Sequence, residues 1–536
     1  MRLAATVFLV ALVFPLTLFG DTYPRQPAVD ALHYRFQLTL ADETARIEAE
    51  ADITLKLNAY TPEFAVDLIA KTEDRGMSVA AVTTVGHPVA YSHETNRLKL
   101  AVPANAKVGD ELTYTIKYAG TPADGLRALE TVHGDPAIFS DNWPDRARHW
   151  LPLIDHPYDK ATGEMIVVAP AQFQVVSNGR LVEEIDLPNG RRRTHWHQSV
   201  PIASWLFALG VARFDVHHVA MVRGIPLQTW VFPQDRVQGR ALFEETSRVA
   251  LEFFGEHVGP YSYEKLANVQ ASGIGGGMEN ATAIFYGDKG VASGRAPVVH
   301  EIAHQWFGNA VTERDWDDVW LSEGFATYFA HLYTEHVEGR DAFARDLARS
   351  RERVLEVEDK LPNTPIIHRN LSDMKSVLNQ LVYQKGAWVL HMLRQEIGTD
   401  RFWAGIRDYY RRYRDQNAST DDLRQVMEQV SGKDLRWFFT QWLTRSGVPF
   451  VEGRWRFVPG RQQLEVTLRQ TQQVDPFRLN VEIGIVDDDG ATRIERVALE
   501  TRENQFAFAV KALPKAVVLD PNTALMARLG ALTQLR

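Results

Sequence analysis

Hydrophobic and polar residues alternate along the first part of the chain. From residue 32 to about 214 one residue in two is apolar over many short runs, as at Tyr34, Phe36 and Leu38. A period of two is typical of antiparallel strands with one face buried. We therefore expect a large β-rich N-terminal domain over 22–220.

The pattern changes after about residue 224. Apolar residues then recur every three to four positions, which predicts amphipathic helices over 238–257, 293–310, 322–338, 341–359, 377–397, 400–414 and 420–431. A strand at Pro226–Phe232 precedes these helices. A mixed α/β domain over 221–447 is predicted, and it ends where Gly447-Val448-Pro449 breaks the last helix.

Alternation returns in the last part of the chain. Leu464, Val466 and Leu468 form one such run, and Asp487–Gly490 separates two others. That acidic segment lacks the spacing of a calcium loop and indicates a hairpin turn. A small C-terminal β-sandwich over 448–536 fits this pattern.

The first twenty residues have a separate character. Arg2 is followed by the almost wholly apolar stretch Leu3–Phe14, and the first stretch rich in polar residues begins at Asp21. A short basic start before an apolar segment is typical of a secretory signal, so we expect residues 1–20 to be a signal peptide and the protein to be exported, periplasmic or extracellular. The alternative is an uncleaved leader that anchors the protein to a membrane.

Composition narrows the classes of function. The chain has 536 residues, which predicts two to four domains, and a formal net charge of −9, which argues against a nucleic-acid partner. It contains no cysteine. Disulfides, cysteine metal sites and thiol nucleophiles are therefore excluded.

One segment carries recognisable chemistry. Residues 297–309 read PVVHEIAHQWFGN, with Pro297 suited to the first turn of a helix. His300 and His304 lie four apart, so their imidazoles project from one helix face and can hold one metal ion. Glu301 points about 100° around the axis, from where its carboxylate can reach a water beside that ion.

A third ligand is needed, because catalytic zinc usually has three protein ligands and one open position. Glu323 supplies it, in the segment LSEGFATYFAHLY, where Ser322 is the expected helix cap. Eighteen residues separate His304 from Glu323, enough for a second helix to return beside the first. One zinc ion is the predicted cofactor, with cobalt or manganese as replacements in vitro.

These motifs resemble a known family. HEIAHQWFGN followed by SEGFA at this spacing is similar to the gluzincin metallopeptidases, and more narrowly to the membrane alanyl aminopeptidase and leukotriene hydrolase family. Gly276-Gly277-Met278-Glu279-Asn280 matches that family's GxMEN motif, and Tyr383–Ala387 its YxKG segment. The resemblance implies a saddle-like N-terminal sheet domain, a thermolysin-like catalytic domain and a zinc aminopeptidase activity.

The resemblance also implies a role for each motif residue. Glu301 is the general base for a zinc-activated water, and Tyr383 stabilises the oxyanion. Glu279 pairs with the α-ammonium group of a peptide that has a free N-terminus, which confines cleavage to the first peptide bond. Neighbouring residues of that motif are expected to bind substrate: Gly276, Gly277, Met278 and Asn280.

The sequence departs from the family at a second amine contact. Trp143 occupies the position of the usual acid or amide, so Asp141 or Asn142 is a possible substitute, and an aromatic face over the ammonium is another. Asp318 is a candidate to orient a ligand histidine, with Asp315 and Asp317 equally eligible.

Four functions are weighed. A zinc aminopeptidase is favoured; a zinc endopeptidase, a non-catalytic binding relative and an epoxide hydrolase are the alternatives. Retention of His300, His304, Glu323 and Glu301 argues against a binding protein, since a scaffold has no need of them. The preferred N-terminal residue and the oligomeric state are left open.

Overall fold

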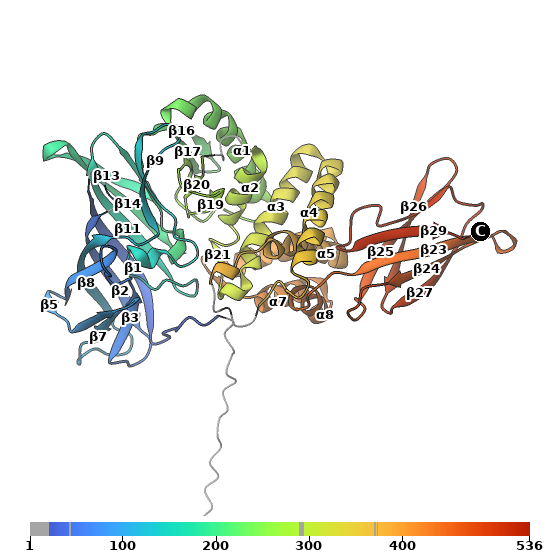
Figure 1. Cartoon of the computed structure of the whole chain (residues 1–536), viewed down its shortest axis with the longest axis horizontal. Helices are drawn as coiled ribbons and strands as arrows, with labels where there is room; N and C mark the ends of the chain where they lie inside the picture. The colour runs from blue at the N-terminus through green and yellow to red at the C-terminus, as the bar shows by residue number, and fades with distance from the viewer. Residues whose placement is uncertain are drawn as a thin grey trace, which may run out of the picture.

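The computed structural model describes residues 21–41, 44, 46–288, 294–368, 371 and 374–535, so the predicted leader lies outside the described residues. The chain forms an elongated molecule, with β-sheets at one end, helices in the middle and a β-sandwich at the other end (Figure 1). The predicted fold class, in which two β-rich parts flank a mixed α/β part, is confirmed. None of the helices in the described part of the chain has the length and hydropathy of a membrane-spanning segment.

The N-terminal part is built on one large sheet of the described residues. Its strand order is β13-β14-β11-β1-β2-β8-β4-β5, with bounds Arg180–Leu187, Arg191–Ala203, Lys160–Pro170, Val29–Leu40, Ile47–Leu57, Glu111–Thr121, Gly76–Thr84 and His87–Pro88. In β1 the alternating residues Tyr34, Phe36 and Leu38 are all at most 3% exposed. The period of two in the sequence thus corresponds to one buried face, as predicted.

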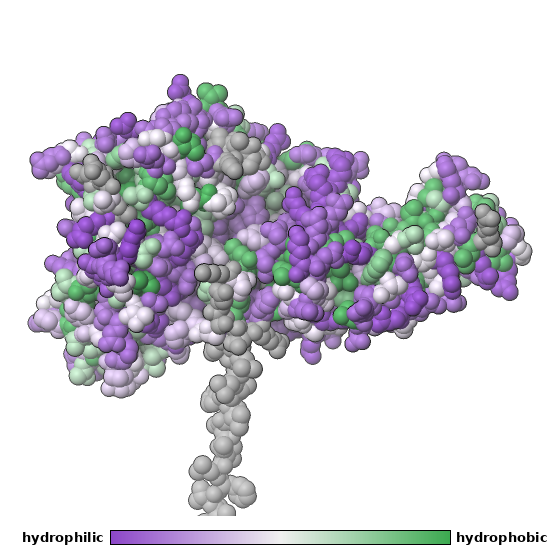
Figure 2. Space-filling model, in the orientation of Figure 1, coloured by the Kyte–Doolittle hydropathy of each residue, from purple (hydrophilic) through white to green (hydrophobic). Residues whose placement is uncertain are grey.

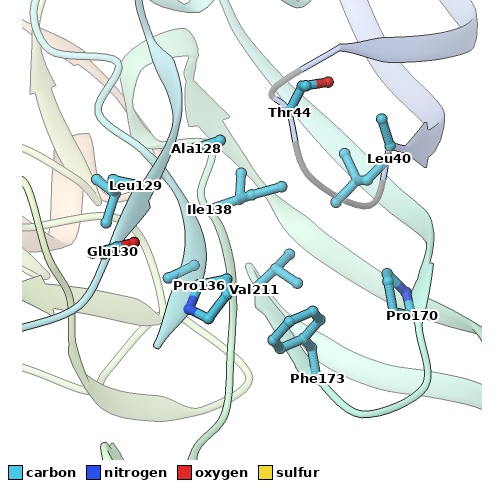
Figure 3. Close-up of a pocket in the computed structure, with 12 residues that line it drawn as sticks. Leu40, Thr44, Ala128, Leu129, Glu130, Pro136, Ile138, Pro170, Phe173 and Val211 are labelled. Atoms are coloured by element: carbon cyan, nitrogen blue, oxygen red, sulfur yellow. The ribbon is translucent and has the colours of Figure 1, made fainter. Parts of the chain in front are cut away.

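Smaller sheets complete this part of the molecule. One has the order β12-β15-β10-β9, with bounds Gln174–Ser177, Leu209–Ala212, Pro136–Ser140 and Leu126–Glu130. Another has the order β3-β7-β6, with bounds Glu63–Asp67, Arg97–Ala101 and Tyr91–Glu94. A pocket of about 330 Å³ lies where Leu40, Ile138 and Phe173 approach one another, and its lining is largely apolar (Figure 3).

The central part opens with a mixed sheet that borders the predicted site. Its order is β16-β17-β18-β20-β19, with bounds Asp215–Val222, Ile225–Val231, Leu266–Gln270, Ala283–Tyr286 and Gly277–Met278. The short strand β19 pairs only with β20 and forms the edge of the sheet. One of its sides is therefore available to another extended chain. A two-stranded pair joins β21 and β22, Val311–Glu313 and Gln416–Ala418.

Most central helices lie where the apolar spacing predicts them. The observed bounds are α1 Arg236–His257, α2 Arg295–His304, α3 Trp320–Glu338, α4 Arg340–Lys360, α5 Gly386–Ile397, α6 Thr399–Tyr413, α7 Thr420–Ser431 and α8 Arg436–Phe439. The prediction for 293–310 was too long, because α2 ends at His304. The stretch 377–397 is not one helix, since a π-helical turn at Leu381–Lys385 precedes α5.

Two glycines bring α3 and α5 into main-chain contact. A Cβ atom placed on Gly324 would lie 3.0 Å from the Cα atom of Gly386, which leaves no room for a side chain between the helices. The residue before Gly324 is Glu323, and the π-helical turn ends just before Gly386. This contact therefore sets the position of the predicted metal ligand relative to that turn.

The C-terminal part is a sandwich of two sheets. One has the order β27-β24-β23-β29, with bounds Glu503–Ala509, Gln463–Gln470, Phe450–Val458 and Arg528–Gln534. The other has the order β26-β25-β28, with bounds Thr492–Leu499, Leu479–Val486 and Ala516–Leu519. Asp487–Gly490 forms the predicted hairpin turn between β25 and β26.

Candidate metal centre

The two histidines of α2 meet Glu323 in the first turn of α3. Nε2 of His300 and Nε2 of His304 each lie 3.2 Å from Oε2 of Glu323, and the two nitrogens are 3.1 Å apart. The ligand atoms of these three residues lie within 4.8 Å of one another. The structure thus brings together the two imidazoles and the carboxylate that the sequence singled out.

His304 is held in a fixed orientation by its second nitrogen. Nδ1 lies 3.1 Å from the carbonyl oxygen of Phe307 and 3.0 Å from the hydroxyl of Ser322. A proton on Nδ1, donated to that carbonyl, leaves a lone pair on Nε2 facing His300 and Glu323. The expectation that Ser322 caps α3 is wrong: the helix begins at Trp320, and Ser322 contacts the histidine instead.

The charges around this trio favour a cation. Burial opposes ionisation of Glu323, but the neighbouring imidazoles outweigh burial and lower its pKa to about 2. Burial also opposes a charge on His304, yet the carboxylates of Glu279 and Glu323 raise its pKa to about 10. Two imidazole nitrogens and one carboxylate form a donor set that fits zinc, with one coordination position left open.

Glu301 lies beside the trio without belonging to it. It belongs to a second group, formed by the carboxylates of Glu301 and Glu279 and the imidazole of His304, whose ligand atoms lie within 4.8 Å of one another. Burial raises the pKa of Glu301 well above its usual value, and the nearby acids add to this effect. A Cβ atom on Gly277 would lie 2.1 Å from a carboxylate oxygen of Glu301, so only glycine leaves that carboxylate its place.

Glu279 faces the same space from the sheet. It is 5% exposed, and its Oε1 has no hydrogen-bond partner among the described residues. Burial raises the pKa of its carboxyl group. Its main-chain carbonyl accepts hydrogen bonds from Gln305 and Asn309, at 2.9 and 2.7 Å. The sequence patterns did not predict a role for these two amides. Their place directly after HEIAH was the available signal.

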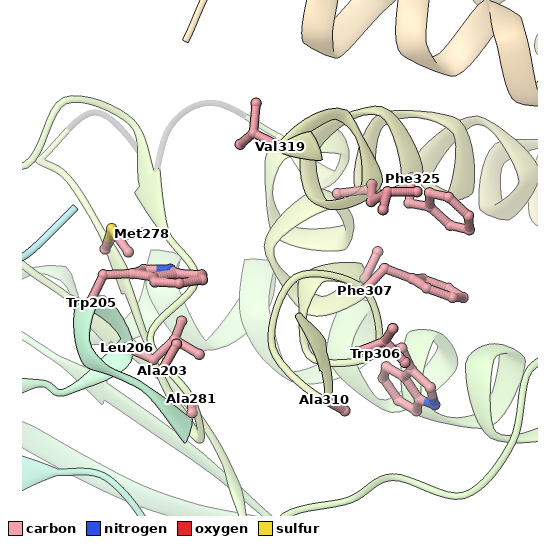
Figure 4. Packing of buried hydrophobic residues seen from close by; sticks show 14 of the residues in the cluster. Ala203, Trp205, Leu206, Met278, Ala281, Trp306, Phe307, Ala310, Val319 and Phe325 are labelled. Carbon is pink, nitrogen blue, oxygen red and sulfur yellow. The ribbon is translucent and has the colours of Figure 1, made fainter. Parts of the chain in front are cut away.

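Residues around Glu279 border the same space. Met278 is 4% exposed and lies on β19, while Asn280 is 1% exposed with its Nδ2 unpartnered within the described part of the chain. Gly276 has φ +114°, a conformation that favours glycine, and a Cβ there would meet open space. Buried apolar side chains pack in this part of the molecule, with Trp205 and Met278 on one side and Trp306, Phe307 and Phe325 on the other (Figure 4).

Tyr383 stands at the centre of the π-helical turn. Such turns shift one residue out of the regular helical register and often occur at functional sites. The ring of Tyr383 is stacked on that of His300, with centroids 6.1 Å apart. Burial raises the pKa of the phenol, and the carboxylates of Glu323 and Glu279 raise it further. Tyr383 therefore remains a hydrogen-bond donor beside the predicted metal ligands.

The candidates for a second amine contact are engaged elsewhere. Asn142 is fully buried, donating to the carbonyl of Phe207 and accepting from the indole of Trp150. Asp141 pairs with Arg146. Trp143 packs its ring against that of Trp316, with centroids 5.1 Å apart. No interaction among the described residues distinguishes any of the three as an amine contact.

The prediction that Asp318 orients a ligand histidine is wrong. Its carboxylate accepts hydrogen bonds from the hydroxyl and the main-chain nitrogen of Thr420, at 2.5 and 3.2 Å. Asp318 thus fixes the start of α7. Asp315 pairs with Arg25 at 2.9 Å, which ties the beginning of the described chain to the central domain.

The chain was compared with known proteins. Residues 30–206 match the peptidase M1 N-terminal domain, and residues 243–442 match the peptidase family M1 domain. Together these models match more than half of the sequence. The chain belongs to peptidase family M1. Both family domains thus occur in the order that the sequence pattern indicated.

Other M1 proteins align with parts of this family member. Aminopeptidase A of Gloydius brevicauda is 31% identical over 330 residues, which are 58% of this chain and 34% of that protein. The chain therefore spans about a third of the length of such curated relatives. The crystal structure of Legionella pneumophila aminopeptidase A in complex with aspartic acid superposes with a TM-score of 0.80 at 19% identity, covering 94% of this chain and 60% of that one.

A second solved structure has a similar fold. The M1 zinc metallopeptidase from Deinococcus radiodurans superposes with a TM-score of 0.68 at 24% identity, covering 79% of this chain and 95% of that one. At such identities both superpositions establish the M1 fold of the chain.

Proposed function

We propose that this chain is a zinc-dependent aminopeptidase that hydrolyses the N-terminal peptide bond of peptides with a free N-terminus. The observation that carries the proposal is Glu279, a buried acid with an unpartnered oxygen among the described residues, beside Glu301 and His304. A buried carboxylate oxygen without a hydrogen bond is stabilised by a cationic donor. The α-ammonium group of a peptide supplies that charge next to the metal ligands.

One zinc ion is the cofactor in this proposal. His300, His304 and Glu323 would hold it, since their ligand atoms converge. When bound, such an ion lowers the pKa of a water molecule and polarises a carbonyl oxygen. The second acidic group shares His304 with the first, so the two groups do not form independent metal sites.

The chain's own residues then perform the proton transfers. Glu301 accepts a proton from the attacking water and later delivers it to the leaving amine. A raised pKa suits both steps, because the group must hold the proton between them. Tyr383 donates its hydroxyl hydrogen to the oxygen that becomes negative as the carbonyl is attacked.

The strand β19 positions the substrate. Its free edge offers main-chain groups to an extended peptide; Gly276 permits close approach of that peptide, and Gly277 leaves room for the carboxylate of Glu301 beside it. Met278 and Asn280 border the first residue of the substrate. The ion pair with Glu279 ends the binding path at the first residue of the substrate, so a peptide cannot extend past that point.

Further parts of the proposal concern the whole chain. We infer that residues 1–20 direct export, that domains span 22–220, 221–447 and 448–536, and that nucleic acid is not a partner. The membrane is a partner only if the leader is retained. Mass spectrometry of the mature N-terminus tests the leader, and limited proteolysis tests the domain bounds.

A substrate panel tests the proposed activity. Purified protein is assayed on aminoacyl amides and on one peptide in free and N-acetylated forms, with and without a chelator. We expect release of the first residue, loss of turnover with chelator and recovery with zinc. Equal cleavage of the acetylated peptide would instead indicate an endopeptidase, and no turnover with zinc bound would contradict both.

A further inference from the structure

A cavity opens from the metal centre toward helix α4. Its volume is about 490 Å³, and it is bounded by α2, α3, α4 and the π-helical turn. His300, Glu301 and Tyr383 form one end of its lining. The cavity is thus continuous with the place where the proposed reaction occurs.

The position of Glu279 indicates which part of a bound peptide would enter the cavity. That carboxylate, which binds the N-terminal amine in the proposed function, is not among the cavity's lining residues, whereas Glu301 is. A peptide anchored at Glu279 passes Glu301 and continues into the cavity. The residue that follows the scissile bond therefore enters it.

The far wall carries the solvent-exposed side chains of two arginines. Arg349 and Arg353 project from successive turns of α4 into the lining. Arg349 forms an ion pair with Asp346, whose carboxylate also lies 4.0 Å from Nδ1 of His331. Within the described residues Arg353 has no acidic partner at ion-pair distance. The solvent face of the molecule over α4 is strongly hydrophilic (Figure 2).

Three polar groups in the lining lack partners. The hydroxyl of Ser350, Nε2 of His331 and Oε1 of Gln384 are buried without a hydrogen bond to any described residue. Ser350 is 2% exposed and Gln384 is 9% exposed. Buried polar atoms are normally satisfied, so such a set indicates a ligand that would satisfy it.

The chemistry of that ligand follows from the unmet groups. Burial lowers the pKa of His331 to about 4, which keeps the ring neutral. The hydroxyl of Ser350 can donate a hydrogen bond, and so can Nε2 of His331 in the tautomer that carries its single proton on that nitrogen. Together with the guanidinium of Arg353 they suit a carboxylate, which only accepts. The free oxygen of Gln384 suits a peptide N–H group. A basic residue fits less well, because Asp346 is already paired.

We propose that this cavity, the α4 pocket, binds a carboxylate carried by the residue that follows the scissile bond. The proposal rests on the proposed aminopeptidase function. In a dipeptide the carboxylate is the C-terminal group, and in a longer peptide it is the side chain of Asp or Glu. The preferred substrates are therefore dipeptides, or peptides with an acidic second residue.

Two substrate pairs distinguish these sources. Ala-Leu against Ala-Leu-amide isolates the terminal carboxylate, and Ala-Glu-amide against Ala-Gln-amide isolates the side chain. We expect kcat/KM in at least one pair to favour the carboxylate by roughly tenfold, as for a hydrogen bond to a charged group. Arg353→Met should bring that ratio close to one, and Arg353→Lys should keep part of it.

Matched variants separate binding from folding. Arg345→Met removes an exposed arginine of the same helix that does not line the cavity, and it should leave the ratio unchanged. Ser350→Ala should reduce the ratio without removing a charge. Ratios near one in the wild type, or a ratio that Arg353→Met does not alter, overturn the proposal. Failure to cleave any aminoacyl amide would instead refute the proposed function itself.

Discussion

Nε2 of His304 and Oε2 of Glu323 lie 3.2 Å apart, although eighteen residues separate them in the sequence. The contact joins the end of α2 to the first turn of α3, and Ser322 binds the other nitrogen of the same imidazole. Neighbouring residues of α3 thus hold both sides of His304. The proposed base, Glu301, takes no part in this contact. It can therefore be replaced without removing any of the three proposed metal ligands.

Glu301→Gln should retain the metal and lose hydrolysis. The amide keeps the shape of the side chain but accepts no proton, so we expect kcat to fall about 1,000-fold. Metal content per chain, measured by mass spectrometry, should match the wild type. Glu323→Gln is the control, because it should lose metal as well as activity; full residual activity in Glu301→Gln would refute the role of the base.

Tyr383→Phe should lower kcat with little change in KM. In the proposed mechanism the phenol stabilises the charge that develops during the reaction, so its loss should cost about 100-fold or more in kcat. Steady-state kinetics on one aminoacyl amide measures this effect. A change confined to KM would mean that Tyr383 binds the substrate rather than the transition state.

Glu279→Ala should abolish the preference for a free N-terminus. Loss of one partner of a buried ion pair costs about 3–5 kcal/mol, which predicts a fall of at least about 100-fold in kcat/KM for free peptides. N-acetylated peptides lack the ammonium group and should be affected far less. The ratio between free and acetylated forms of one peptide is the decisive quantity.

Lys385→Met should destabilise the turn that carries Tyr383. Lys385 is fully buried and donates to Glu358 at 2.6 Å and to the carbonyl of Gly447 at 2.9 Å. The variant leaves a buried acid without its cation, at a cost of about 3–5 kcal/mol. Calorimetry should show a lower thermal midpoint, and the double variant with Glu358→Leu should recover part of it.

Acid should destabilise the protein through His391. Its Nε2 donates to the carbonyl of Thr523, and its Nδ1 lies 3.1 Å from the hydroxyl of Tyr328. Burial lowers the pKa of this imidazole from 6.5 to about 3. Between these values the unfolded chain binds more protons, so unfolding becomes easier as the pH falls below 6.5, by about 1.4 kcal/mol per pH unit.

The thermal midpoint at pH 7 and pH 5 measures this effect. His391→Gln can replace both hydrogen bonds without titrating, so its midpoint should depend less on pH than that of the wild type. His218→Gln, at an exposed position of β16, is the control and should show the wild-type dependence. An unchanged slope in His391→Gln would refute the assignment.

The residues of the candidate metal centre could be predicted from the sequence because their spacing within two short segments determines which side chains share a helix face. His300 and His304 share a face of any helix, and a second amphipathic segment places Glu323 at its start. The end of α2 was not predictable from that spacing. Gly308, four residues beyond that end, has φ +108°, a conformation that no helix contains, and a Cβ there would lie 2.2 Å from the hydroxyl of Ser322.

Other features depend wholly on packing between distant segments. Gln305 and Asn309 bind the carbonyl of Glu279 across 26 and 30 residues of sequence. The π-helical turn around Tyr383 follows apolar residues that also suit an ordinary helix. From the sequence Asp318 was predicted to lie beside the metal ligands, but it accepts a hydrogen bond from Thr420, 102 residues away.

The contact between Gly324 and Gly386 limits how this molecule can diverge. Because main chain meets main chain there, the distance between the carboxylate of Glu323 and the phenol of Tyr383 is set by the van der Waals contact of the two helices. A wider reaction chamber for bulkier peptides is therefore not reachable by changing side chains at that crossing. Variation in substrate choice must come from the outer walls, where α4 and β19 can exchange residues without disturbing the spacing of the catalytic groups.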